Sequence, residues 1–250
     1  MYPREYFDTF WRNDIKEEVF VAMPFHDEFV AVWEKAIKPG IEENGKYHLK
    51  ANRVDVTTLS GSILSSIFDG IAHSKIFLAD ISTTDTGKWA GQRNGNVMYE
   101  VGLAHALRHS SEVILLKSDS APINFDIMSI LIHNYDKNNL EQAKQEIGEK
   151  VIATINNVEI TKTLNVEKAV ASINPPAMTY LINYGKYVGF SLRKPANMGD
   201  ELVAIKEYLA IQLLIEKKII EYEPKSSNKN QAFYKWTFFG FAILQRLNLS

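Results

Sequence analysis

Carboxylate and amide side chains gather in one stretch of the sequence, directly after an apolar run. Asp80 ends that run, and Asn94, Asn96 and Glu100 follow it. Breaking the bond between a sugar and a nitrogen base develops positive charge on the anomeric carbon, and a carboxylate can meet that charge as nucleophile or as electrostatic stabiliser. Glu100 fits this role and Asp80 is the second catalytic candidate. Asn94 and Asn96 are of the types that hold sugar hydroxyls.

Aromatic side chains and further polar groups complete the predicted substrate site. Phe25, Trp89 and Tyr99 are candidates for stacking on a base. The remaining substrate-binding candidates are Pro24 and Asp85. Three of these residues also have a structural interpretation that needs no substrate: Asp80 could cap a turn, Asn96 could be the N-cap of a helix, and Trp89 could anchor a loop.

Several kinds of chemistry are excluded or disfavoured by composition. The chain has 250 residues and no cysteine, so it has no disulfide, no thiolate zinc site and no cysteine nucleophile. His105 and His109 lie at i, i+4, but no carboxylate ligand completes a metal site, and neither a G-x-G-x-x-G fingerprint nor a Walker G-x-x-x-x-G-K sequence occurs. We therefore expect no metal and no cofactor.

Apolar runs alternate with amphipathic segments through residues 17–156. Strands are predicted at 19–23, 47–56, 76–81, 113–116 and 130–135, and helices at 29–41, 62–73, 97–107 and 140–156. Such alternation gives parallel βαβ units, so we predict an α/β fold, a Rossmann-like (flavodoxin-like) doubly wound parallel sheet. Ligands of these sheets bind beyond the carboxyl ends of the strands, where Pro24, Asp80 and the start of helix 97–107 should meet. The helix dipole there should favour an ionised Glu100.

A second unit is predicted after the pattern weakens at 158–174, where Pro175-Pro176 should stop a helix. We divide the chain into 1–160 and 161–250. The second part is predicted to contain helices at 178–188 and 200–218, a two-stranded hairpin at 219–223 and 232–238, and a closing helix at 240–247. This order is typical of a small α+β winged-helix domain.

Charge is distributed unevenly between the two parts. Residues 166–250 hold 11 Lys and Arg against 7 Asp and Glu, whereas the whole chain is at −2. Five lysines near the predicted hairpin are candidates for contact with nucleic acid or a partner: Lys217, Lys218, Lys225, Lys229 and Lys235. Lysines here could equally be ordinary solubilising residues, and the apolar stretch 234–247 favours a protein partner or an oligomer.

Three segments resemble a known family: V-F-V-A-M-P-F at 19–25, I-F-L-A-D-I-S at 76–82 and N-G-N-V-M-Y-E-V-G-L-A-H-A-L at 94–107. They are similar to the nucleoside 2-deoxyribosyltransferase-like family and the adjoining bacterial TIR-like proteins, over roughly residues 17–156. The resemblance places the family's glutamate on Glu100 and its sugar-binding aspartate on Asp80. Many members carry a further aspartate where this chain has Asn94. Residues 124–127, ahead of a strand ending in Tyr135, also resemble the TIR-like branch.

The resemblance implies an enzyme acting at the anomeric carbon of a nucleotide, either NAD or a purine deoxynucleotide. It also implies a role as toxin or effector in anti-phage defence, and the winged-helix part is similar in arrangement to retron-associated toxins. The expected partners are the nucleotide, nucleic acid or a defence-system protein at the C-terminal domain, and a homo-oligomer or larger complex. The alternative is a sensor that binds a nucleotide signal without turnover.

The chain is expected to be cytoplasmic and to make no membrane contact. No stretch approaches the roughly 20 apolar residues of a membrane span, and the first 18 residues carry charges where a signal peptide is apolar.

Overall fold

The computed structural model describes residues 11, 14–54, 63–123, 131–193, 201–228 and 231–250. The chain divides into two compact units, Met1–Glu159 and Ile160–Ser250. The division lies one residue from the one predicted. It falls inside a helix, α5 (Leu140–Ala171), which runs well beyond the predicted end at residue 156.

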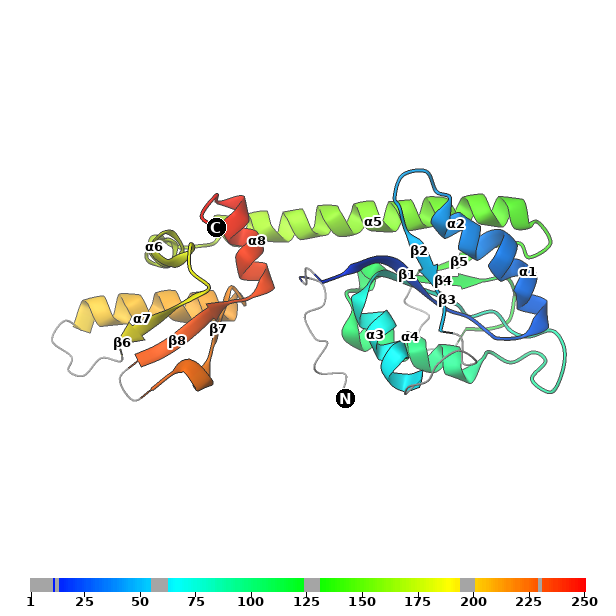
Figure 1. The fold of residues 1–250 in the computed structure, drawn as a ribbon, viewed down its shortest axis with the longest axis horizontal. Coiled ribbons are helices and arrows are strands. Elements are labelled where there is room, and N and C mark those ends of the chain that lie inside the picture. Colours follow the sequence, from blue (N-terminus) through cyan, green and yellow to red (C-terminus); the bar gives the residue numbers. More distant parts are fainter. Residues whose placement is uncertain (1–10, 12–13, 55–62, 124–130, 194–200, 229–230) are drawn as a thin grey trace. The chain divides into compact units, whose positions relative to one another are not determined.

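The N-terminal unit is built on a five-stranded parallel sheet of order β2-β1-β3-β4-β5 (Figure 1). The strands are β1 (Lys16–Ala22), β2 (Lys50–Asn52), β3 (Ser74–Asp80), β4 (Val113–Lys117) and β5 (Ile132–Asn134). This is the flavodoxin-type order: β2 is added on one side of β1, and β3, β4 and β5 are added in turn on the other side. The predicted fold class is confirmed.

Helices cover both faces of this sheet because neighbouring residues of each strand point to opposite sides. One face packs against α1 (Val30–Val32), α2 (Lys38–Glu42) and α5 through a core that includes Val19, Val21 and Leu78. The other face packs against α3 (Ile63–His73) and α4 (Gly95–Leu107) through a core that includes Phe20 and Phe77. The central strands are therefore apolar where both faces are covered, at Val19–Ala22 of β1, Ile76–Ala79 of β3 and Ile114–Leu116 of β4.

The helix predicted at 29–41 is divided into four short pieces. A 3-10 turn η3 (Asp27–Phe29) leads into α1, and a π-helical segment η4 (Trp33–Ile37) separates α1 from α2. Pro39 has no N–H to donate to the helix. The turn just before it is a wider, π-helical one, in which the Lys38 N–H donates to the Trp33 carbonyl. Gly40 then lets α2 approach α5 closely, since a Cβ there would lie 2.8 Å from the Lys144 carbonyl oxygen.

The C-terminal unit contains a three-stranded antiparallel sheet of order β6-β8-β7, not the predicted two-stranded hairpin. Its elements are α6 (Pro175–Tyr184), β6 (Gly189–Arg193), α7 (Glu201–Glu216), β7 (Ile220–Tyr222), a 3-10 turn η7 (Pro224–Ser226), β8 (Gln231–Trp236) and α8 (Phe238–Arg246). The predicted α+β character of this unit is confirmed, and its sheet has one strand, β6, that was not predicted. The core centres on Phe190, whose ring lies 4.8 Å from that of Tyr184 and 5.4 Å from that of Trp236.

One helix of this unit has bounds that differ from the predicted ones. Helix α5 ends at Ala171, ahead of Pro175 and Pro176 as predicted, but the two prolines also begin α6, because the first helical positions need no N–H and Asn174 caps the helix through the Ala177 N–H. The helix predicted to reach residue 188 ends at Tyr184, and residues 189–193 form β6 against β8.

Among the described residues, none of the helices combines the length and the hydropathy that crossing a bilayer requires.

Candidate functional site

Glu100 lies in the second turn of α4, on the side of the helix that faces the sheet. The residues three, four and seven positions later, Leu103, Ala104 and Leu107, are all buried in the core. Glu100 therefore continues the apolar stripe of α4 toward the helix start. That end of α4 follows β3 and lies at the carboxyl edge of the sheet (Figure 1).

The Glu100 carboxyl has no hydrogen bond or ion pair from any described side chain. Burial raises its pKa from 4.5 to about 7, and desolvation is the cause. The prediction that the helix dipole keeps it ionised was wrong, since Glu100 is the sixth residue of α4 and the dipole acts within the first turn. A half-buried carboxyl with a raised pKa and no structural partner is typical of a functional group.

Asp80 is fully buried at the end of β3 and binds groups of its own chain. Its Oδ1 accepts the Ser82 N–H at 3.0 Å and the Ser82 hydroxyl at 2.5 Å, and its Oδ2 accepts the Tyr135 hydroxyl at 2.6 Å. Burial raises the pKa of Asp80 against the lowering effect of these donors. We therefore replace the predicted catalytic role with a structural one: the side chain ties the loop after β3 to the end of β5.

Asn94 and Asn96 differ in role. Asn94 is the N-cap of α4, and its Oδ1 accepts the backbone N–H groups of Asn96 at 3.0 Å and Val97 at 3.3 Å. The interpretation of Asn96 as the N-cap was wrong, because the N-cap is Asn94 and the helix begins at Gly95, two residues earlier than predicted. The Asn96 side chain is exposed on the first turn, where it stays a candidate for substrate contact.

The candidates after β1 lie beside the end of β3. Ala22 is paired with Ala79, so Pro24 and Phe25 leave the sheet next to Asp80. Pro24 is buried, whereas Phe25 is 55% exposed with the Arg53 guanidinium 4.4 Å from its ring centroid.

The remaining candidates are exposed. Tyr99 is 54% exposed on α4 and Trp89 is 60% exposed in the loop before it. Asp85 forms an ion pair with Lys137, and its backbone N–H donates to Glu28 at 3.1 Å. The carboxylate predicted to bind substrate is thus paired with a lysine at the start of the segment leading into α5.

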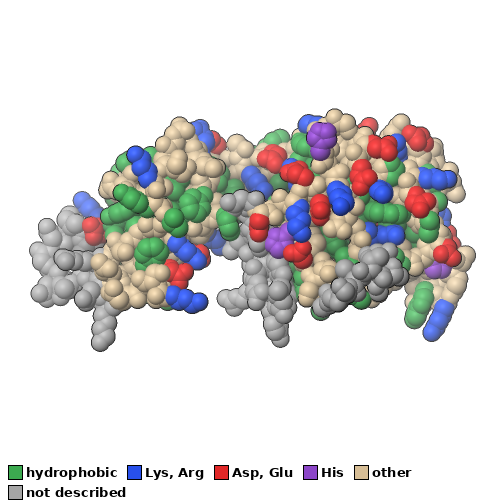
Figure 2. Space-filling model, viewed as in Figure 1, with side chains coloured by type: hydrophobic (Ala, Val, Ile, Leu, Met, Phe, Trp, Pro, Cys, Tyr) green, Lys and Arg blue, Asp and Glu red, His purple; other side chains and the backbone are tan. Residues whose placement is uncertain are grey.

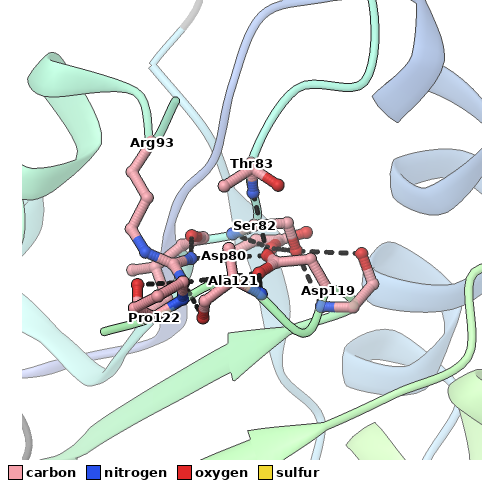
Figure 3. Close-up of polar contacts among 9 residues, drawn as sticks. Asp80, Ser82, Thr83, Arg93, Asp119, Ala121 and Pro122 are labelled. Carbon is pink, nitrogen blue, oxygen red and sulfur yellow. Dashed lines mark hydrogen bonds and ion pairs between the residues drawn. The ribbon is translucent and has the colours of Figure 1, made fainter. Parts of the chain in front are cut away.

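A polar cluster that the sequence did not reveal closes the loop between β3 and α4 (Figure 3). Arg93 donates to the Asp119 carboxylate at 3.3 and 3.4 Å, to the Ala121 carbonyl at 3.0 Å and to the Pro122 carbonyl at 3.1 Å. Asp119 also accepts the Thr83 N–H at 2.9 Å. Asp119 follows β4 at the carboxyl edge, so the rule that led to Asp80 would have found it had it been applied to β4.

The lysines selected in the C-terminal unit have different environments. The Lys235 ammonium lies 3.2 Å from both Glu221 and Glu223 on the neighbouring strand. Lys218 closes α7 in a left-handed conformation, with φ of 54°. Lys217 is half-buried and Lys225 is exposed in η7, while Lys229 and residues 124–127 lie outside the described residues.

Acidic and basic side chains are interspersed on the face of the N-terminal unit drawn in Figure 2. Within the described residues, no three His, Asp or Glu side chains lie close enough together to bind a metal ion.

The geometry thus defines a doubly wound α/β domain in which Glu100, at the carboxyl edge of the sheet, is half-buried and makes no bond to a described side chain. No family model and no curated protein matches the chain. Among solved structures, the chain is similar to the lysine decarboxylase LdcF of Francisella novicida, with a TM-score of 0.36 and 13% identity. The match covers 83% of this chain and 26% of that one.

Proposed function

We propose that the N-terminal unit is a nucleotide N-glycosidase in which Glu100 acts on the anomeric carbon. The observation that carries the proposal is Glu100 itself: a desolvated carboxyl without a structural partner, beside the carboxyl edge of a flavodoxin-type sheet. Ligands of such sheets bind at this edge, next to the point where the strand order reverses. The resemblance of residues 19–25, 76–82 and 94–107 to deoxyribosyltransferase-like proteins supports the same reaction.

The chemistry follows from the charge that develops in the transition state. The bond from C1′ to the base nitrogen breaks, its electron pair leaves with the base, and C1′ becomes cationic. An ionised Glu100 facing C1′ stabilises that cation or bonds to it, and its desolvation strengthens the attraction. Water then supplies hydroxide to C1′ and a proton to the base. NAD and purine deoxynucleotides are the proposed substrates.

Residues around Glu100 are proposed to orient the nucleotide. The exposed rings of Phe25 and Tyr99 offer faces for the base, and the exposed amide of Asn96 offers hydrogen bonds to the sugar. Asp80 supports the site indirectly by fixing the loop after β3.

The test is chromatography of a mixture of NAD and deoxynucleotides incubated with the wild-type protein and with Glu100→Gln. Free base is expected from the wild type and is expected to fall at least about 100-fold in the variant, as for loss of one essential charged group. Tyr187→Phe, an exposed position in the other unit, serves as matched control. Equal base release by wild type and Glu100→Gln contradicts the proposal, and nucleotide binding without product favours a sensor.

The C-terminal unit is proposed to bind a partner that controls this activity, in keeping with an effector of anti-phage defence in the cytoplasm. A protein partner or a second copy fits the paired state of Lys235 better than nucleic acid does, because a lysine held by two glutamates has less charge to offer a phosphate. Base release therefore has to be measured in cell extract as well as with the purified chain.

A further inference from the structure

One carboxylate holds both ends of the loop that joins β3 to α4. Thr83 leaves β3 and Arg93 precedes α4, and the two residues form an antiparallel bridge with each other. Asp119 accepts the Thr83 N–H at 2.9 Å and both terminal nitrogens of Arg93 at 3.3 and 3.4 Å. We call Thr83, Arg93 and Asp119 the clasp.

The clasp is largely shielded from water and charged. The side chains of Arg93 and Asp119 are 8% and 14% exposed. Burial alone would raise the pKa of Asp119, but the Thr83 and Ala121 N–H groups and the Arg93 guanidinium outweigh it and hold that pKa below its usual value. The planar guanidinium further donates to the Ala121 and Pro122 carbonyls, a pattern that lysine cannot reproduce.

Arg93 of the clasp lies two residues before α4 begins at Gly95. Asn94 follows Arg93 directly and caps α4 through the N–H groups of Asn96 and Val97. Glu100 lies in the next turn, on the stripe that continues into Leu103 and Ala104. Among the described side chains none bonds to the Glu100 carboxyl, so its burial depends on where the start of α4 lies.

We propose that Arg93 and Asp119 are positioning residues that fix the start of α4 and thereby hold Glu100 in its desolvated place at the sheet edge. The inference rests on the proposed function only for its effect on catalysis. Arg93 and Asp119 act through the helix start and do not touch the substrate.

The test uses the full chain and two conservative variants, Arg93→Lys and Asp119→Asn. Carbon NMR of protein labelled at glutamate carboxyls gives the titration midpoint of Glu100, identified by the signal lost in Glu100→Gln. The midpoint is expected to fall from about 7 by about one unit or more in both variants. The kcat for base release is expected to fall about 10- to 100-fold with a smaller change in KM. Lys137→Gln, which breaks the exposed ion pair of the same loop, is expected to change neither.

The two readouts separate the clasp from the reaction. If the wild type releases no base, the proposed function fails while the midpoint still decides on the clasp. Folded variants that keep the wild-type midpoint overturn the inference. Hydrogen exchange of backbone amides tests the clasp in the wild type, without any variant. The Thr83, Asn96 and Val97 N–H groups are expected to exchange as slowly as those of β3. If they exchange as fast as the N–H groups of residues 86–89, the inference is overturned.

Discussion

Glu100 is a polar residue in an apolar position, and the folded state is destabilised by its charge. Its pKa is about 7 in the folded chain and 4.5 in a solvated one. Between these values the unfolded chain releases the proton first, so the free energy of unfolding falls as the pH rises from about 4.5 to about 7 and is constant above. Each pKa unit corresponds to 1.36 kcal/mol, so the free energy of unfolding falls by at most about 3 kcal/mol over this pH range.

The first prediction is that Glu100→Gln is more stable than the wild type at high pH. The variant cannot ionise, so its stability relative to the wild type is expected to grow by up to about 3 kcal/mol between pH 4.5 and pH 7.5. Urea unfolding at the two pH values measures this difference. A difference that does not change with pH would show that Glu100 is solvated in the folded protein.

The second prediction concerns the pH dependence of base release. The proposed mechanism needs the ionised Glu100, so kcat/KM is expected to rise with pH up to about 7 and then to level off. Initial rates at low substrate from pH 5 to 9 provide the measurement. A rate that falls through pH 7 assigns Glu100 the opposite role, protonation of the leaving base.

The ends of two helices explain two residues that the sequence had marked as binding residues. Asn94 caps α4, and Lys218 ends α7 in the left-handed position of a Schellman motif. The Lys218 N–H donates to the Ile215 carbonyl at 2.8 Å, and the Ile219 N–H donates to the Leu214 carbonyl at 2.8 Å. Both residues were selected from the sequence as binding residues, and both have a backbone role that accounts for their position.

The third prediction follows from the left-handed backbone of Lys218. Glycine reaches this conformation without the steric penalty of a side chain, so Lys218→Gly is expected to raise stability by about 0.5–1 kcal/mol. The matched change Lys217→Gly, one residue earlier, is expected to lower it. Thermal unfolding compares the two variants, and loss of stability in Lys218→Gly would mean that its side chain packs favourably.

The whole molecule consists of two compact units that share one continuous helix. Each unit has its own apolar core: the sheet with its two covered faces in Met1–Glu159, and the aromatic cluster around Phe190 in Ile160–Ser250. Units with separate cores can lose structure separately.

The fourth prediction is that the C-terminal unit can be unfolded without the sheet. Phe190 is 4% exposed, so Phe190→Ala is expected to destabilise its unit by about 3–5 kcal/mol. Hydrogen exchange should then show lost protection in β8 and unchanged protection in β1 and β3. Phe238→Ala, at a ring that is 45% exposed, is the control with a small expected effect. Equal loss of protection in both units contradicts the prediction.

The sequence by itself determined the elements of the N-terminal sheet and the start of its candidate site. Strands buried on both faces leave continuous apolar runs, such as residues 19–23, and helices leave a three- and four-residue period, so both can be read locally. The rule that ligands meet the carboxyl ends of parallel strands then selected Glu100. The same local signals placed the start of the next helix at residue 178 and not at Pro175, because a proline that follows one helix can also begin another.

Only the tertiary structure decided which polar side chains are functional candidates and which hold the fold. Asp80 binds Tyr135, 55 residues away, and Arg93 binds Asp119, 26 residues away. Strand β6 forms because it pairs with β8, and α7 and β7 lie between the two strands in the sequence. These contacts depend on strand order and register, which bring distant residues together and leave no periodic signal along the chain. Burial likewise sets the pKa of Glu100, since desolvation arises from everything packed around a residue and not from its neighbours in sequence.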